Sequence, residues 1–224
     1  MDTMFDTLLQ LPLFQGLGQE DLTHILGKVK FHFAKHKDHT LLAQSLTPCR
    51  QLLFLLKGEV TATTISSNGL YNVTEYFQAP YLIEPQSLFG MDTHYVATYH
   101  SCGEAHTVTI DKSFAMNELF KYDIFCLNYL NILSNRAQVL NRRVWNHNYH
   151  SISSEERILR FIRLHLERPS AGRKEIKIRM EDLAQIVNDT RTGISKTLNN
   201  MQLQGKIELR RGEIIIPDAA LLYI

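Results

Sequence analysis

The chain has 224 residues, enough for one large domain or two small ones with a buried core, and we expect two. Its three cysteines, Cys49, Cys102 and Cys126, are odd in number and widely spaced, which fits a reduced compartment better than a disulfide framework. No segment approaches the ~20 apolar residues of a membrane span, and no basic run precedes the N-terminal apolar stretch. We therefore expect a cytoplasmic protein without a signal peptide.

The formal net charge is +1, which by itself neither favours nor excludes a nucleic-acid partner. Its distribution is uneven. Residues 1–150 hold 11 Lys and Arg against 13 Asp and Glu, whereas residues 151–224 hold 13 against 10. An excess of this size also arises by chance, so it only supports a DNA-binding segment found on other grounds.

From the N-terminus, apolar residues at helical spacing predict two short helices between Phe5 and Leu26, with PLFQGLGQED as the break. Short β-rich runs follow between Val29 and Ile110, separated by turn residues such as Lys57-Gly58 and Asn68-Gly69. The runs are VKFHFA, HTLLAQ, QLLFLLK, EVTATTI, YNVTEYF, HYVATY and AHTVTI. This spacing predicts an antiparallel barrel or roll.

The pattern becomes helical again from about Lys112 to His147. Apolar residues there recur at intervals of three and four, which is typical of a coiled-coil seam: Leu130, Leu133, Ala137, Leu140 and Val144. One interpretation is a helix lying along its own barrel. We favour the other, a seam between two copies of the chain, because a helix this long extends past a small roll.

A polar hinge at residues 151–154 leads into a further helix, capped by Ser153 or Ser154 and ended by Pro169 to Gly172. After it, the stretch MEDLAQIVNDTRTGISKTLNNM predicts two helices joined by the turn Asn188-Asp189. Thr190 is the expected N-cap of the second helix. The expected inner faces are Leu183, Ala184, Ile186 and Val187 on the first helix, and Ile194, Thr197, Leu198 and Met201 on the second.

Thr190, as the cap, and the outward side chains of the second helix suit a helix laid in a major groove: Arg191, Thr192, Ser195, Lys196 and Asn199. Residues 207–216 then predict two strands around a glycine turn, which is a wing with Arg210 and Arg211 at its tip. These two arginines and Lys206 are expected near phosphates. A helical hairpin with a solvated charged face is the alternative, and the wing favours DNA binding.

With these segments in order, the chain resembles the cAMP receptor protein and fumarate-nitrate regulator (Crp/Fnr) family of bacterial transcription regulators. The matching segments are LFQGLGQEDL, LLFLLKGEV, the long helix and EDLAQIVNDTRTGISKTLNNMQLQGKIELRRGEIII. The resemblance implies an α+β chain, with a β-roll of the jelly-roll, cyclic-nucleotide-binding type at 1–120. It further implies a dimerisation helix and hinge at 121–150, and a winged helix-turn-helix at 151–224.

The family's functional residues carry over only in part. Arg191 matches the base-reading arginine and Lys196 another basic position, whereas Thr192 stands where several members carry glutamate. The operator sequence therefore does not transfer. The resemblance implies a homodimer on a near-palindromic operator, with RNA polymerase as a further partner.

The effector segment departs more strongly from members that bind cyclic nucleotides. Glu84 can stand for their ribose-binding glutamate, but Tyr95 to Thr98 occupy the place of their phosphate-binding arginine, and no Arg or Lys occurs between Lys57 and Lys112. A buried phosphate without a cation costs several kcal/mol. We therefore do not expect cyclic AMP, and the candidate pocket residues are Ile83, Glu84, Phe89, Tyr95 and Thr98.

Other cofactors and activities find little support. Three cysteines exclude an iron–sulfur cluster with four cysteine ligands, while ten histidines leave a haem open. We interpret His32, His36 and His39 as a solvated segment and expect no metal site. The sequence contains no G-x-G-x-x-G, Walker A, G-x-S-x-G, H-E-x-x-H or C-x-x-C motif, so we expect no enzyme. A dimer that has lost DNA binding is the third alternative, which Arg191, Lys196, Asn199 and Asn200 argue against.

Overall fold

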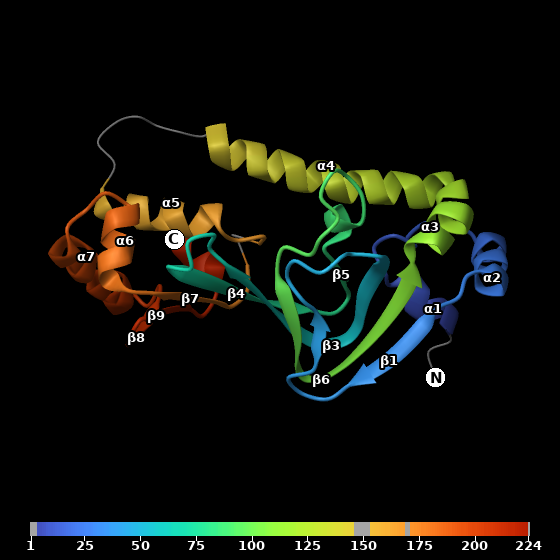
Figure 1. The fold of residues 1–224 in the computed structure, drawn as a ribbon, viewed down its shortest axis with the longest axis horizontal. Coiled ribbons are helices and arrows are strands. Elements are labelled where there is room, and N and C mark those ends of the chain that lie inside the picture. Colours follow the sequence, from blue (N-terminus) through green and yellow to red (C-terminus); the bar gives the residue numbers. More distant parts are fainter. Residues whose placement is uncertain (1–3, 146–152, 169–170, 224) are drawn as a thin grey trace. The chain divides into compact units, whose positions relative to one another are not determined.

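The computed structural model describes residues 4–145, 153–168 and 171–223 (Figure 1). The chain forms two compact units. The N-terminal unit combines Met1–Thr61 with Phe77–Gln138, and the C-terminal unit combines Ala62–Tyr76 with Val139–Ile224. The boundaries expected from the sequence, at residues 120 and 150, remain predictions. The expected first domain, residues 1–120, contains residues 62–76, whereas in the structure Ala62–Tyr76 belongs to the C-terminal unit.

The N-terminal unit is a roll of antiparallel strands followed by helices, as the sequence predicts. The long strand β6 pairs with both β1 and β2, and β3 pairs with β5. Its elements are α1 (Met4–Leu9), α2 (Gln19–Lys28), β1 (His32–His36), β2 (Leu41–Ala43), β3 (Gln51–Ile65), β5 (Tyr81–Ile83), η1 (Pro85–Leu88), β6 (Thr98–Asp111), α3 (Lys112–Glu118), η2 (Leu119–Lys121) and α4 (Asp123–Trp145). Strand β3 continues past Thr61 and helix α4 past Gln138 into the C-terminal unit.

Two turn predictions in this region have different outcomes. Asn68-Gly69 does form the turn between β3 and β4, and Gly69 has a φ of 69°. The predicted turn at Lys57-Gly58 is wrong, because β3 runs through it without a break. Gly58 is needed there for a different reason. A Cβ at this position would lie 2.3 Å from the carbonyl oxygen of Glu104, so only glycine allows the two backbones to approach.

The core of the roll is rich in aromatic side chains, and helix α4 begins within it. Phe14 packs edge-on against Phe125 of α4 with ring centroids 5.4 Å apart, and Phe120 packs on Phe125 and on Tyr129. The Tyr129 hydroxyl donates a hydrogen bond to the carbonyl of Pro85, at 2.6 Å. These contacts fix one face of the first half of α4 on the roll.

In the C-terminal unit, strands β4, β7, β9 and β8 lie side by side in that order, and helices pack against them (Figure 1). Its elements are β4 (Tyr71–Gln78), α5 (Ser154–Leu164), β7 (Lys174–Ile178), α6 (Met180–Ile186), α7 (Arg191–Leu203), β8 (Glu208–Arg210), β9 (Glu213–Ile216) and η3 (Ala219–Tyr223). Strand β7 was not predicted, and β4 reaches its place from the N-terminal half of the sequence.

Candidate nucleic-acid interface

Helices α6 and α7 form the predicted helix-turn-helix. Asn188 takes the left-handed conformation in the turn, with a φ of 53°. The Thr190 side chain caps α7 by accepting a hydrogen bond from the Gly193 amide at 3.0 Å, as expected from the sequence. Asp189 closes the turn, because its Oδ1 accepts from the Thr190 amide at 2.7 Å.

The inner face of α7 is fully buried against α5, α6 and the sheet. Ile194, Leu198 and Met201 have no exposed surface, and Leu183 and Ala184 of α6 lie in the same apolar cluster. Ile186 does not belong to this inner face as predicted, since it is 40% exposed near the end of α6. The packing fixes which face of α7 remains open to solvent.

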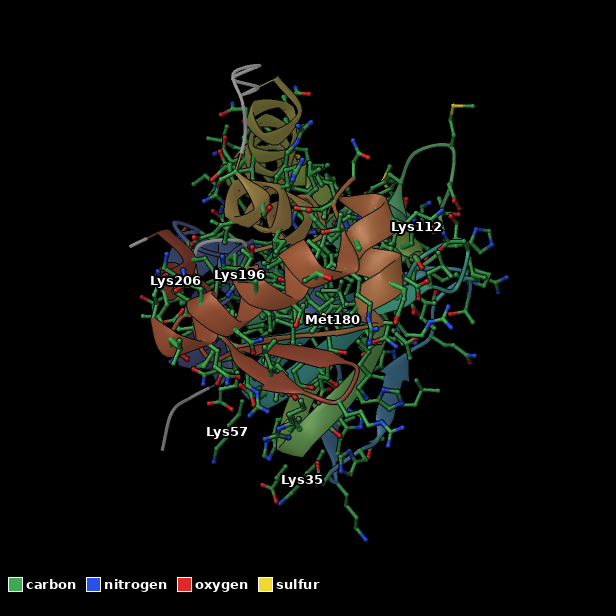
Figure 2. All side chains as sticks on the ribbon, turned by 90° about the vertical axis from the view of Figure 1, so that its left-hand side faces the viewer. Lys35, Lys57, Lys112, Met180, Lys196 and Lys206 are labelled. Carbon is green, nitrogen blue, oxygen red and sulfur yellow. The ribbon has the colours of Figure 1, made fainter. Side chains whose placement is uncertain are left out.

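The open face of α7 carries the side chains predicted to contact DNA. Arg191, Thr192, Lys196 and Asn199 are exposed, as is the capping residue, and Ser195 is half-buried. Figure 2 looks onto the side of the C-terminal unit that carries α6 and α7, with Lys196 labelled. Arginine, lysine, asparagine and hydroxyl side chains on one helix face are the groups that bind base edges and phosphates in a major groove.

Arg191 already has a partner without DNA. Its Nε lies 2.9 Å from Oε1 of Glu181 on α6, and the two side chains are 70% and 61% exposed. An ion pair this exposed is weak, at about 0–1 kcal/mol. The pair positions the Arg191 guanidinium beside the start of α7, and a base or a phosphate can easily replace Glu181 as its partner.

The wing consists of β8 and β9, which pair from Glu208↔Ile215 to Arg210↔Glu213. Arg210 and Arg211 are exposed at its tip, where Gly212 has a φ of 72°. Lys206 is different. Its ammonium lies 2.9 Å from the carboxylate of Glu155, and its side chain is only 19% exposed. The structure thus ties Lys206 to the start of α5, whereas the two arginines extend freely into solvent.

A polar network that the sequence reasoning missed holds α5 against the turn. Asp189 Oδ2 accepts hydrogen bonds from the Ser154 hydroxyl and, at 2.7 Å, from the guanidinium of Arg157. The Ser154 hydrogen bond, together with the Thr190 amide and Arg157, lowers the pKa of Asp189 below its ordinary value of 3.8. Asp189 was predicted only as a turn residue, and no local pattern indicates that Ser154 and Arg157 meet it.

The five candidate effector residues lie in the N-terminal unit, and Glu84 is central among them. Glu84 is buried in the left-handed conformation, with a φ of 37°. Its carboxylate accepts hydrogen bonds from the amides of Val96 and Ala97, each at 2.8 Å, and from the Ser87 hydroxyl, also at 2.8 Å. The chain's own carboxylate therefore occupies the amides in the segment where the resemblance places the phosphate-binding pair.

The remaining candidates are engaged in the fold. Ile83 ends the buried strand β5, and the Thr98 hydroxyl accepts from the Ser45 amide at 3.1 Å. Phe89 lies under the ammonium of Lys112, which is 4.6 Å from the ring centroid. Burial raises the pKa of Tyr95, with a further contribution from its hydrogen bond to the Cys49 thiol. Within the described residues, no group of three His, Cys, Asp or Glu is placed to hold a metal ion.

The predicted seam lies on α4. Leu130 and Leu140 are 59% and 54% exposed, Ala137 is exposed and Leu133 is half-buried. The side chain of Val144 lies outside the described residues. Leu127, which the sequence analysis did not include, is also exposed, at 57%. Half-exposed leucines at a spacing of three and four form an apolar stripe on this helix.

No helix in the described part of the chain is long and apolar enough to cross a membrane.

Comparison with known domain families decides the nature of the C-terminal unit. Residues 156–223 match the Crp-like helix-turn-helix domain. The chain carries a Crp-like helix-turn-helix domain. Two solved structures share the fold of this chain over almost its whole length. The catabolite activator protein of Thermus thermophilus is 18% identical and aligns with a TM-score of 0.50, covering 95% of this chain and 96% of that one.

The second structure, described as a Crp/Fnr-family transcriptional regulator of Eubacterium rectale, is 18% identical with a TM-score of 0.51, covering 96% of this chain and 97% of that one. The sensor domain of the regulator DNR from Pseudomonas aeruginosa aligns at 16% identity with a TM-score of 0.50, covering 63% of this chain and 97% of that one. A sequence comparison with curated proteins gives no match. The Crp-like domain confirms the resemblance to the Crp/Fnr family for residues 156–223, and the solved structures confirm the fold.

Proposed function

We propose that the chain works in the cytoplasm as a homodimeric transcription regulator that reads a near-palindromic operator. In this account each protomer places α7 in a major groove, with the two copies about one turn of DNA apart. The observation that carries the proposal is the open face of α7, whose Arg191, Lys196 and Asn199 are exposed while its opposite face is fully buried. RNA polymerase is the further partner that the family resemblance implies.

The dimer part of the proposal rests on α4. One face of this helix is packed on the roll through Phe125 and Tyr129, and another exposes Leu127, Leu130 and Leu140. A second copy of α4 is the natural partner for such a stripe, since a heptad-like seam is buried by an identical seam across a two-fold axis. The two readers would then be held at a fixed spacing.

We propose further that the roll does not respond to a cyclic nucleotide. Glu84 uses both carboxylate oxygens on the amides of Val96 and Ala97, and an incoming phosphate would have to displace it. Lys112, the first lysine after this segment, donates to the carbonyl of Leu88 at 2.7 Å. A phosphate placed beside a buried carboxylate, without an arginine, would be repelled by it.

The test of DNA reading is Arg191→Ala, with the exposed Lys177→Ala on β7 as a control that removes the same charge. Fluorescence anisotropy against a selected duplex should show a loss of about 1–3 kcal/mol in binding for Arg191→Ala and relaxed preference at one base pair. A loss that is equal for all duplex sequences would make Arg191 a phosphate contact. Equal effects of the two substitutions would remove the assignment of α7 as the reading helix.

A further inference from the structure

The sheet of the C-terminal unit is completed by a strand from the N-terminal half of the sequence. Residues 71–75 of β4 pair antiparallel with residues 174–178 of β7, from Tyr71↔Ile178 to Glu75↔Lys174. On its other side β7 pairs with β9 of the wing. Strand β4 therefore covers an edge of β7 that would otherwise expose unpaired backbone groups. Figure 1 shows β4 and β7 next to each other in this sheet.

One face of β4 is part of the apolar core of the DNA-reading unit. Val73 is 4% exposed and belongs to the same buried cluster as Ile176 and Ile194. The ring of Tyr71 packs edge-on against Phe161 of α5, with centroids 5.1 Å apart, and its hydroxyl forms a 2.6 Å hydrogen bond with Nε2 of His165. The helix-turn-helix thus packs on a core to which the hairpin of β3 and β4 contributes directly.

The end of the paired segment holds a buried ion pair. The Lys174 side chain has no exposed surface, and its ammonium lies 2.8 Å from Oε2 of Glu75, whose side chain is 9% exposed. The same carboxylate accepts hydrogen bonds from the amides of Glu167 at 2.6 Å and Arg168 at 3.2 Å. Glu75 therefore joins β7 to the segment that follows α5, and loss of either charge would remove a buried ion pair.

The second face of β4 is also attached to β7. The Tyr76 hydroxyl donates to the Glu175 carboxylate at 2.9 Å. The guanidinium of Arg173 lies 5.1 Å from the centre of the Tyr76 ring and 2.6 Å from the same Glu175 carboxylate. Backbone pairing, apolar packing and polar contacts thus all hold the hairpin to this strand.

We propose that residues 62–76 form a clamp that couples the roll to the DNA-reading unit, with the Glu75–Lys174 pair as its latch. Strand β3 enters the clamp directly from the roll, and β4 returns directly to it. A change in the roll that shifts these strands therefore reaches β7 through the strand pair, as does a change in the reader in the opposite direction. The clamp itself does not depend on which DNA sequence the reader binds.

The first test is hydrogen–deuterium exchange on the full chain, comparing the wild type with Glu75→Gln. Glutamine keeps the size of the side chain but removes the negative charge that faces the Lys174 ammonium. Amide exchange in residues 165–168 and 174–178 should accelerate at least about tenfold, while β1 and β6 keep their rates. Glu208→Gln, on the edge strand β8 of the same sheet, is the control and should change neither region.

Unchanged exchange in residues 165–168 and 174–178 would overturn the latch. Equal acceleration in β1 and β6 would also overturn it, because the substitution would then weaken the whole fold. The affinity of Glu75→Gln for an operator duplex should fall about tenfold. An unchanged affinity together with accelerated exchange would show that the hairpin is attached to the reader without being coupled to it.

The second test restores the strand pair by a different bond. Asn72 and Lys177 are register partners, and such antiparallel neighbours have Cα atoms about 4.5–5.5 Å apart, within reach of a disulfide. In the Glu75→Gln background, Asn72→Cys with Lys177→Cys, oxidised by glutathione disulfide, should recover both exchange protection and affinity, and reduction should abolish the recovery. The two single cysteine variants are the controls. Failure of the cross-link to form, or its formation without recovery, would contradict the clamp.

Discussion

Gly193 lies in the first turn of α7, against the turn that joins the two helices of the reader. A Cβ there would be 2.7 Å from Oδ1 of Asp189 and 3.0 Å from the Thr190 hydroxyl. Asp189 is held by its own hydrogen bonds and does not move freely. Gly193→Ala should therefore lower the free energy of unfolding by roughly 1–2 kcal/mol, although alanine favours helices, and urea unfolding measures this.

A matched control for that change is Asn199→Ala on the exposed face of the same helix. It removes no buried contact and should leave stability within about 0.5 kcal/mol while weakening DNA binding. A more stable Gly193→Ala would show that Asp189 can leave the turn at no cost, which would contradict the role given to this network.

Glu181 holds the guanidinium of Arg191 in the absence of DNA, at 2.9 Å. Replacing it by glutamine removes a competitor for Arg191 and a negative charge near the phosphates. We predict that Glu181→Gln binds an operator duplex up to about fivefold more tightly, because an exposed ion pair is worth less than about 1 kcal/mol. Anisotropy titration at low salt measures this, and weaker binding of the variant would mean that Glu181 orients Arg191 on DNA.

Asp189 predicts a dependence of stability on pH. Because its pKa is lowered in the folded state, chiefly by the Ser154 hydrogen bond, its stabilising effect is complete above the ordinary aspartate value of 3.8 and is lost as the pH falls through the folded-state value. Asp189→Asn should therefore be less stable than the wild type at pH 7, and the difference should shrink below about pH 4. Thermal unfolding from pH 7 to 3 checks this, and a constant difference would contradict it.

At this scale the sequence predicts local features well and distant partners poorly. The Thr190 cap and the Asn188 turn follow from residue types within a few positions. By contrast, the pairing of Lys206 with Glu155, 51 positions away, and the occupation of the Val96 amide by Glu84 depend on how the chain folds back. Lys206 was therefore predicted to lie near phosphates, although its charge is already matched within the unit.

Helix α4 carries the prediction at the scale of elements. Leu130→Asp with Leu140→Asp places two charges on its exposed apolar stripe, and an interface seam does not tolerate unpaired charges. Sedimentation should show a monomer that stays folded and binds operator DNA at least about tenfold more weakly, since one reader then acts alone.

The control for this change is Asn135→Asp, which adds a charge at an exposed position of α4 outside the stripe. It should remain dimeric. A dimer that survives both leucine substitutions would remove α4 as the dimer interface and turn attention to another face of the chain.

Strands were predicted less accurately than helices, and the reasons are particular. Gly58 looks like a turn residue but serves a close backbone approach within β3. The runs expected at 94–99 and 105–110 are wrong in their bounds, because Thr98 to Asp111 form the single strand β6. In β7, residues 174, 176 and 178 alternate with exposed or half-buried ones, which is a strand pattern. The pattern is hard to recognise because three of the five residues are charged, and one of them, Lys174, is buried in an ion pair.

At the scale of the whole chain, the sequence predicts the order of roll, long helix and winged helix-turn-helix but not the clamp. Alternation in residues 71–77 indicates a strand without saying which strand it meets. Its partner β7 lies about a hundred positions later, with Glu75 and Lys174 99 residues apart. Such non-local pairing is decided by the folded core, which Val73 and Ile176 share.

DNA reading by a dimer is tested by selection of the full chain against a randomised DNA duplex pool, with sequencing of the bound fraction and anisotropy at two salt concentrations. We predict salt-sensitive binding and an enriched inverted repeat whose half-sites are about 10–10.5 base pairs apart, bound by two protomers. Binding without any sequence enrichment, or enrichment of a single unrepeated site by one protomer, would contradict a dimer that reads DNA through α7.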